Sequence, residues 1–188
     1  MAGLNATARA ENALSASQAT QFIQQEGNRL VAVLNGPGDW PEKQKRLQAL
    51  INETMDVSGI ARFALGRFWN LASEAQRQEY VALFPAVLLA GVGRTIGGYQ
   101  GVSFTIDRAI QLEERVQVWT TVNRANAPPT QVAWIVEPSA GTPKIGDIIA
   151  QGASLRITER DDCTSFLSHN NYSIQALIET LRRQVAES

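Results

Sequence analysis

The period of the hydrophobic pattern changes once along this chain, near Gly101. Before this point apolar residues recur at helical spacing, and after it they alternate with polar residues, as they do in strands. A run of helices followed by a run of strands is typical of an α+β domain, in which helices cover one face of an antiparallel sheet. A chain of 188 residues is long enough to bury a sizeable core as one domain.

The helical half predicts four helices, over residues 17–34, 41–55, 56–68 and 74–99. Pro41 suits a first helical turn, and Asp56 suits an N-cap. Ser73 and Gln76 have the spacing of a capping box ahead of the longest helix. Residues 1–16 are rich in Ala, Asn and Ser and are predicted to be a disordered start, so the expected domain covers residues 17–188.

The second half predicts an antiparallel meander of four to five strands. Its first three strands carry apolar residues at even positions, including Val102, Phe104, Val118, Trp134 and Val136. We therefore expect the even-numbered residues to face the helices and their odd-numbered neighbours to face outward. A fourth strand region is expected over residues 144–158 with a break at Gly152, then a short segment through Leu167 capped by Asp161 or Asp162, and then a terminal helix from Ser173.

Residues that carry chemistry are scarce. The sequence has one histidine and one cysteine, and it contains no Gly-x-Ser-x-Gly or His-Glu-x-x-His motif. His169 lies in a polar Ser-His-Asn-Asn run and is expected to be a solvated loop residue, while Cys163 is expected to be a small, half-buried residue. We therefore predict no catalytic residue, no metal site and no cofactor, and hence a protein that is not an enzyme.

Composition excludes two further classes of protein. The formal net charge is -1 and the basic residues are scattered, which argues against a nucleic-acid binder. The most apolar stretch, residues 81–93, is far shorter than the roughly 20 residues that a membrane-spanning helix needs. These features predict a soluble protein.

The helix expected over residues 74–99 is unusual because apolar residues surround most of its circumference. A helix of this kind is buried on more than one side. It also carries Gly91, Gly93, Gly97 and Gly98, each of which costs about 1 kcal/mol relative to Ala in a helix interior. Two interpretations remain open: the glycines allow close packing in an ordinary core, or they leave a groove between the helix and the sheet.

Several spaced motifs resemble the MlaC family, the periplasmic lipid-binding components of the Mla ABC transport system, also called toluene-tolerance proteins. The motifs are the run from Asp56 to Trp69 (DVSGIARFALGRFW) with Ser73, Gln76 and Phe84 behind it, Tyr99-Gln100-Gly101, Val132-Ala133-Trp134, and the block from Lys144 to Leu155 (KIGDIIAQGASL) with Arg160 behind it. They occur in the family's order over roughly residues 16–184. Pro143 and Ile96 depart from the Trp and the Tyr common at these places, so the resemblance implies the fold more closely than the pocket shape.

The resemblance implies an antiparallel sheet wrapped by helices around a deep apolar pocket that holds the acyl chains of a lipid, with phospholipid as the expected cargo. It further implies a periplasmic monomer, here without its signal peptide, that carries lipid between an outer-membrane lipoprotein complex and an inner-membrane ABC transport complex with a lipid-binding ring. The residues expected to line the pocket are Phe63, Phe84, Leu88, Val92, Ile96, Tyr99, Phe104, Val118, Trp134, Val136 and Ile148.

Two other functions are compatible with the sequence. One is a small hydrolase or isomerase on an α+β cone, which requires a polar group such as Asp147 or Arg108 to point into the pocket beside His169. The other is a structural adaptor of a transport complex that binds no ligand.

Overall fold

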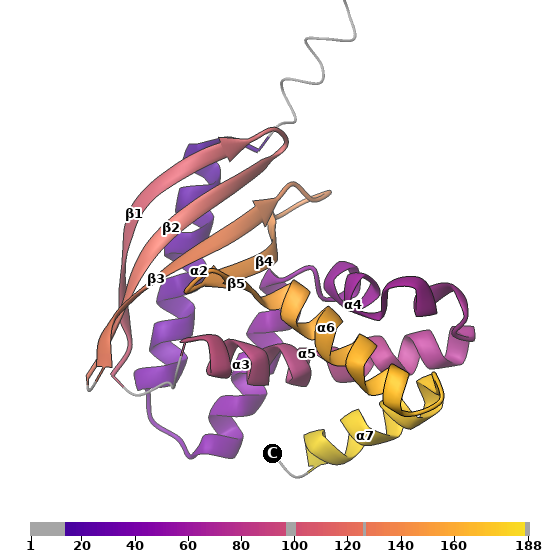
Figure 1. Cartoon of the computed structure of the whole chain (residues 1–188). Helices are drawn as coiled ribbons and strands as arrows, with labels where there is room; N and C mark the ends of the chain where they lie inside the picture. The colour runs from indigo at the N-terminus through magenta and orange to yellow at the C-terminus, as the bar shows by residue number, and fades with distance from the viewer. Residues whose placement is uncertain (1–13, 97–100, 126, 187–188) are drawn as a thin grey trace, which may run out of the picture.

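The computed structural model describes residues 14–96, 101–125 and 127–186. It contains a five-stranded antiparallel sheet in the order β1-β2-β3-β4-β5. Figure 1 shows α2 running along one face of this sheet, while α4, α6 and α7 gather to one side of it, away from β1. The predicted α+β fold is confirmed.

A capping side chain begins each of the first three helices, and Asp56 is the predicted cap among them. They are α2 (Ala16–Asn35), α3 (Trp40–Thr54) and α4 (Val57–Leu65). Their N-caps are Ser15, Asp39 and Asp56, and each side chain accepts a hydrogen bond from a backbone N–H three residues on. Leu14, just before the first cap, is buried in the core, and residues 1–13 of the predicted disordered start lie outside the described residues.

The helix predicted over residues 56–68 is split in two. The α-helix α4 ends at Leu65, with Gly66 as its C-cap, and the chain continues as a 3₁₀ helix, η1 (Gly66–Asn70). Gly66 has a φ of 56°, in the left-handed region that favours glycine and ends an α-helix. The backbone conformation of Gly66 therefore accounts for the change from an α-helix to a 3₁₀ helix.

The helix α5 (Glu74–Ile96) is the centre of the helical layer. It starts at the predicted capping box, in which Gln76 N–H donates to Ser73 Oγ over 3.2 Å and Ser73 N–H donates to Gln76 Oε1 over 3.0 Å. It packs against α3, α4, α6 (Leu155–His169) and α7 (Ile174–Ala186), so the predicted burial on more than one side is confirmed. None of the helices in the described ranges combines the length and apolar character needed to cross a membrane.

The sheet places the predicted even-numbered residues on its helix-facing side. The strands are β1 (Ser103–Leu112), β2 (Arg115–Arg124), β3 (Ala127–Glu137), β4 (Lys144–Ala150) and β5 (Ala153–Ser154). Val118 pairs with Trp134, and Trp134 Nε1 donates to the buried Thr120 hydroxyl over 2.8 Å, so the even positions of β2 and β3 share one face, as the alternation predicts. In β1 a bulge between Ile106 and Arg108 shifts the parity, because Ala109 is the residue that pairs with Val118.

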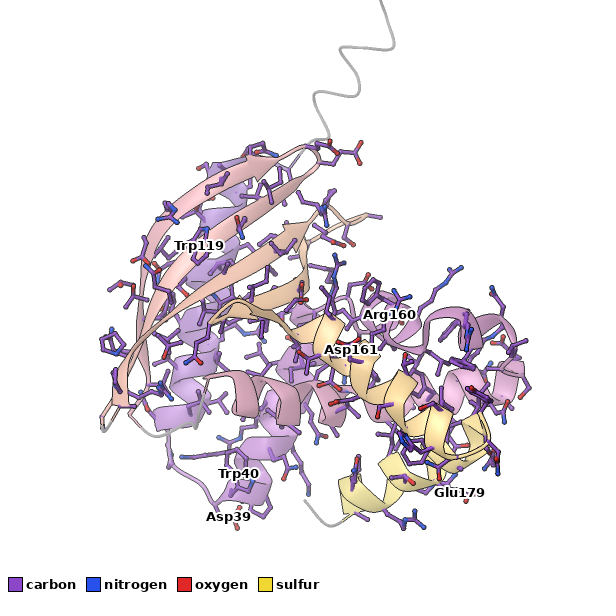
Figure 2. All side chains as sticks on the ribbon, viewed as in Figure 1. Asp39, Trp40, Trp119, Arg160, Asp161 and Glu179 are labelled. Atoms are coloured by element: carbon purple, nitrogen blue, oxygen red, sulfur yellow. The ribbon has the colours of Figure 1, made fainter. Side chains whose placement is uncertain are left out.

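The outward face is less polar than the alternation predicts. Ala133 and Ile135 occupy odd positions of β3 and are nevertheless buried. Ala133 pairs with Trp119, and Figure 2 shows Trp119 on the face of the sheet turned away from α2. The guanidinium of Arg108 lies 4.9 Å from the centre of the Trp119 ring. Large side chains on this face therefore cover their small neighbours.

The prediction of a strand region over residues 144–158 is wrong in its second half, from Leu155 onward. The chain turns at Gln151 and Gly152, both with positive φ, and α6 begins at Leu155. Ser154 caps α6 by accepting a hydrogen bond from Ile157 N–H, so Asp161 and Asp162 lie inside the helix and do not cap it. The residues after Ser154 form a helix although their alternating pattern predicts a strand, because the serine hydroxyl accepts a hydrogen bond from a free N–H of the first helical turn. The predicted terminal helix is confirmed as α7.

Candidate functional site

An apolar cavity lies between α2, α3, α5 and the sheet. Its volume is about 90 Å³. α2 contributes Ile23, Leu30 and Leu34 to its wall, and α3 contributes Leu47, Leu50 and Ile51. Leu89 and Val92 of α5 and Phe104, Val122, Trp134, Ile145 and Ile148 of the sheet complete it. Three helices and four strands thus enclose one apolar space.

Close contact between α2 and β1 shapes one side of this cavity. A Cβ atom added at Gly27 would lie 2.3 Å from Cζ of Phe104, so the phenyl ring rests directly against the helix backbone. Only glycine allows this approach. At the far end of the same helix, Asn35 holds α2 to the chain just before β1, because its side chain bonds both the N–H and the carbonyl of Val102.

The cavity wall carries one charged residue among the described residues, Glu26 of α2, which is only 8% exposed. Its Oε2 atom is 2.7 Å from an Arg29 nitrogen, and a second Arg29 nitrogen is 2.5 Å from Oε2 of Glu53 on α3. The hydrogen bond to Glu53, followed by the charge of Glu26, raises the pKa of Arg29 above its usual value. Thr54, the other polar lining side chain that the structure describes near these residues, donates to Leu50 O.

The structure brings together some of the predicted pocket residues. Val92, Phe104, Trp134 and Ile148 line the cavity. Leu88, Val118 and Val136 are fully buried in the core away from its lining, and Phe84 borders a second groove. The side chain of Ile96 and all of Tyr99 lie outside the described part of the chain.

Phe63, also predicted for the pocket, lies on the α4 side of the molecule. The guanidinium groups of Arg156 and Arg160 lie 4.8 and 5.0 Å from the centre of its ring. Phe63 therefore packs against α6 and not against the sheet. Figure 2 shows Arg160 and Asp161 on that helix.

The residues of α2 and α3 that line the cavity are absent from the predicted site. The apolar stripes that predicted these helices contain them, since Leu30, Leu34, Leu47, Leu50 and Ile51 recur at helical spacing. The stripe was the available signal, but it does not distinguish a residue that faces a cavity from one that faces a filled core.

The polar groups required by the cone-enzyme alternative lie apart from one another. The Asp147 carboxylate accepts hydrogen bonds from Ser154 Oγ, Ile148 N and Arg156 N at the junction of β4 and α6. Arg108 lies over Trp119, and His169 is exposed at the end of α6. Within the described ranges, no three His, Cys, Asp or Glu side chains come together as a metal site.

Cys163 lies deeper than the sequence predicts. It is buried in the middle of α6, and its sulfur is 3.3 Å from the Tyr80 hydroxyl of α5. Burial raises the pKa of the Cys163 thiol to about 11, because the charged thiolate is disfavoured away from water. Burial likewise raises the pKa of Tyr80 well above its usual value. This pair is neutral at physiological pH.

We expect iodoacetamide to alkylate Cys163 at pH 8 at least about a hundredfold more slowly in the native protein than in the denatured protein. The thiolate is the reacting species, and a pKa near 11 leaves only about a thousandth of the thiol ionised at that pH. Mass spectrometry of timed samples measures the rate. Equal rates in the two states would contradict the buried position of Cys163.

A second groove lies on the other side of α5, between α3, α6 and α7. Gly93 borders it, together with Trp40, Phe84, Phe166 and Leu181. Leu89 lines both this groove and the apolar cavity, so α5 separates the two spaces. Gly91 is buried. Gly93 thus faces a groove, but one between helices and not one between helix and sheet.

A sheet and helices that surround an apolar cavity are an arrangement suited to an apolar ligand. The chain belongs to the MlaC family, whose family model, described as MlaC protein, matches residues 24–183. No match was found among curated proteins.

A solved structure has the same fold. It is the phospholipid-binding protein from Ralstonia solanacearum in complex with a phospholipid, which superimposes with a TM-score of 0.72 and is 20% identical in sequence. The match covers 92% of this chain and 98% of that chain. At this level of identity the likeness establishes a shared fold.

Proposed function

We propose that this protein is a lipid carrier that binds acyl chains in the cavity between α2, α3, α5 and the sheet. The observation that carries the proposal is the apolar wall of that cavity, together with membership of the MlaC family. The Ralstonia solanacearum protein of the same fold is described as phospholipid-binding, which favours phospholipid as the cargo.

Transfer of acyl chains from water supplies the binding energy. Each buried methylene contributes about 0.8 kcal/mol, so a long chain gains on the order of 10 kcal/mol without any specific polar contact. Binding of this kind is tight and tolerant of chain structure. It needs no nucleophile, no proton transfer and no cofactor.

A long acyl chain must widen this cavity. A cavity of about 150 Å³ accommodates a ligand the size of benzene, and the volume here is about 90 Å³. Leu30 and Val31 of α2 line the cavity and are partly exposed, so α2 forms an outer wall. We infer that loading moves α2 away from the sheet, with the Phe104 ring following Gly27.

We further propose that the carrier works in the periplasm, between an outer-membrane lipoprotein complex and an inner-membrane ABC transport complex. Family membership supports this role. A carrier between two membranes has to hide acyl chains from water, and an apolar cavity that widens on loading meets that need.

The test is lipid content and lipid uptake. Lipids extracted from the purified protein are expected to include phospholipid, and delipidated protein is expected to take up labelled phospholipid from vesicles. Bovine serum albumin and lysozyme provide the binding and non-binding references. Folded, delipidated protein that takes up no lipid would contradict the proposal.

A further inference from the structure

The charged residue in the cavity wall has no role in binding acyl chains. Glu26 is nearly buried, and a buried carboxylate is costly unless it is paired. Its partner is Arg29, one turn further along α2, with an N–O distance of 2.7 Å. An apolar residue at position 26 would extend the lining without that cost. The pair therefore calls for a functional explanation.

The charges continue from the cavity wall into solvent. Arg29, with 47% of its side chain exposed, contacts Glu53 of α3, which is 57% exposed, over 2.5 Å. The ammonium group of Lys144 donates a hydrogen bond to the backbone carbonyl of Glu53. From the apolar wall outward, the order is a carboxylate, a guanidinium and a second carboxylate, with an ammonium group beside the last.

A zwitterionic phospholipid has a matching order of groups: apolar chains, then a phosphate, then an ammonium group. We propose that the cluster of Glu26, Arg29 and Glu53 binds the headgroup of a zwitterionic phospholipid, with the phosphate on Arg29 and the ammonium group on Glu53. This inference rests on the proposed lipid-carrier function, and it adds a preference for one class of lipid.

The side-chain chemistry of Arg29, Glu26 and Glu53 suits the role that each has in binding the headgroup. A guanidinium has five N–H donors in a planar fork, so Arg29 can keep its bond to Glu26 and present other donors to phosphate oxygens. Glu26 is then a positioning residue that holds Arg29 at the cavity. The lipid ammonium replaces Arg29 as the partner of Glu53, so that every charge stays paired.

An anionic headgroup without an amine fits less well. Its phosphate would take Arg29 from Glu53 and leave that carboxylate unpaired beside another negative charge, which is unfavourable. The three side chains of the cluster carry a net charge of -1, and the Lys144 ammonium group beside them is bonded to the backbone carbonyl of Glu53, so an anionic headgroup gains less here than a zwitterionic one. The expected result is selection by headgroup and not by acyl chain.

Competitive loading tests this selection. Delipidated protein is incubated with vesicles that contain equal amounts of phosphatidylethanolamine and phosphatidylglycerol with identical acyl chains, and the bound lipids are extracted and quantified. We expect about a fivefold excess of phosphatidylethanolamine on the unaltered protein, about 1 kcal/mol of discrimination. Glu53→Gln should bring the ratio close to one, and Glu53→Lys should reverse it.

Glu179→Gln on α7 is the matched control, because Glu179 is an exposed glutamate that does not line the cavity, and Figure 2 shows it on α7, away from the sheet. It should keep the excess of phosphatidylethanolamine. Equal loading of the two lipids on the unaltered protein, or a ratio that neither Glu53 variant changes, overturns the headgroup proposal while leaving lipid binding in place. Absence of both lipids contradicts the carrier function itself.

A free phosphate is the other possible ligand of Arg29. Loading is therefore repeated in 10 mM inorganic phosphate, which has no ammonium group and no acyl chain. The lipid ratio should not change. A ratio that falls to one in phosphate would show a general anion site and overturn recognition of the zwitterionic headgroup.

Discussion

Replacing Leu30 with Trp is expected to lower the lipid bound at saturation by about tenfold. Leu30 lines the cavity from the middle of α2 and is partly exposed, so a larger side chain can enter the cavity without displacing a packed core residue. The indole group is larger than the isobutyl group that it replaces, and the added volume can occupy a space of about 90 Å³. Because the cavity accepts the ring, we expect the free energy of unfolding to change by less than about 1 kcal/mol.

Ala32→Trp is the control on the same helix. Ala32 is exposed and does not line the cavity, so the same indole ring should leave lipid binding unchanged. Uptake of labelled phospholipid by delipidated variants, with circular dichroism to confirm the fold, measures the effect. Full binding by Leu30→Trp would show that lipid occupies another space, with the groove between α3, α6 and α7 as the next candidate.

Replacing Leu88 with Ala is expected to lower the free energy of unfolding by about 2–5 kcal/mol. The Leu88 side chain has no exposed surface and lies in the core at α5, where it is surrounded by other apolar side chains. Its truncation removes buried methyl groups and leaves a void that the neighbours fill only in part. Denaturation with urea, with matched m-values for the two proteins, measures the loss.

Leu71→Ala is the matched control for this change. Leu71 is 73% exposed, so the same substitution should alter stability by less than about 0.5 kcal/mol. Since Leu88 does not line the cavity, the lipid bound per folded molecule should stay the same in Leu88→Ala. A small loss of stability combined with a large loss of bound lipid would contradict this prediction and would assign Leu88 to the binding site.

Local signals in the sequence determined most of the secondary structure. Asp56 and Ser73 cap helices through hydrogen bonds to residues three positions on, and such contacts can be read from neighbouring letters. The alternation through Val118 and Trp134 likewise determined which face of the sheet is buried. The sequence-based prediction failed at residues 151–158, where an alternating pattern favours a strand and Ser154 favours a helix. The turn at Gly152 ends the strand, and Ser154 caps the helix that follows.

The tertiary structure decided which apolar residues face a cavity. Val92 and Leu88 belong to the same helix and the same kind of pattern, but only Val92 lines the cavity. Glu26 and Arg29 are three residues apart on α2, a spacing that predicts their contact, whereas Glu53 meets Arg29 only because α2 and α3 pack together. Hydrophobic periodicity reports that a residue avoids water, and it is the same for a filled core and for a cavity. The difference arises where α2, α3, α5 and the sheet, distant in the chain, approach one another without filling the space between them.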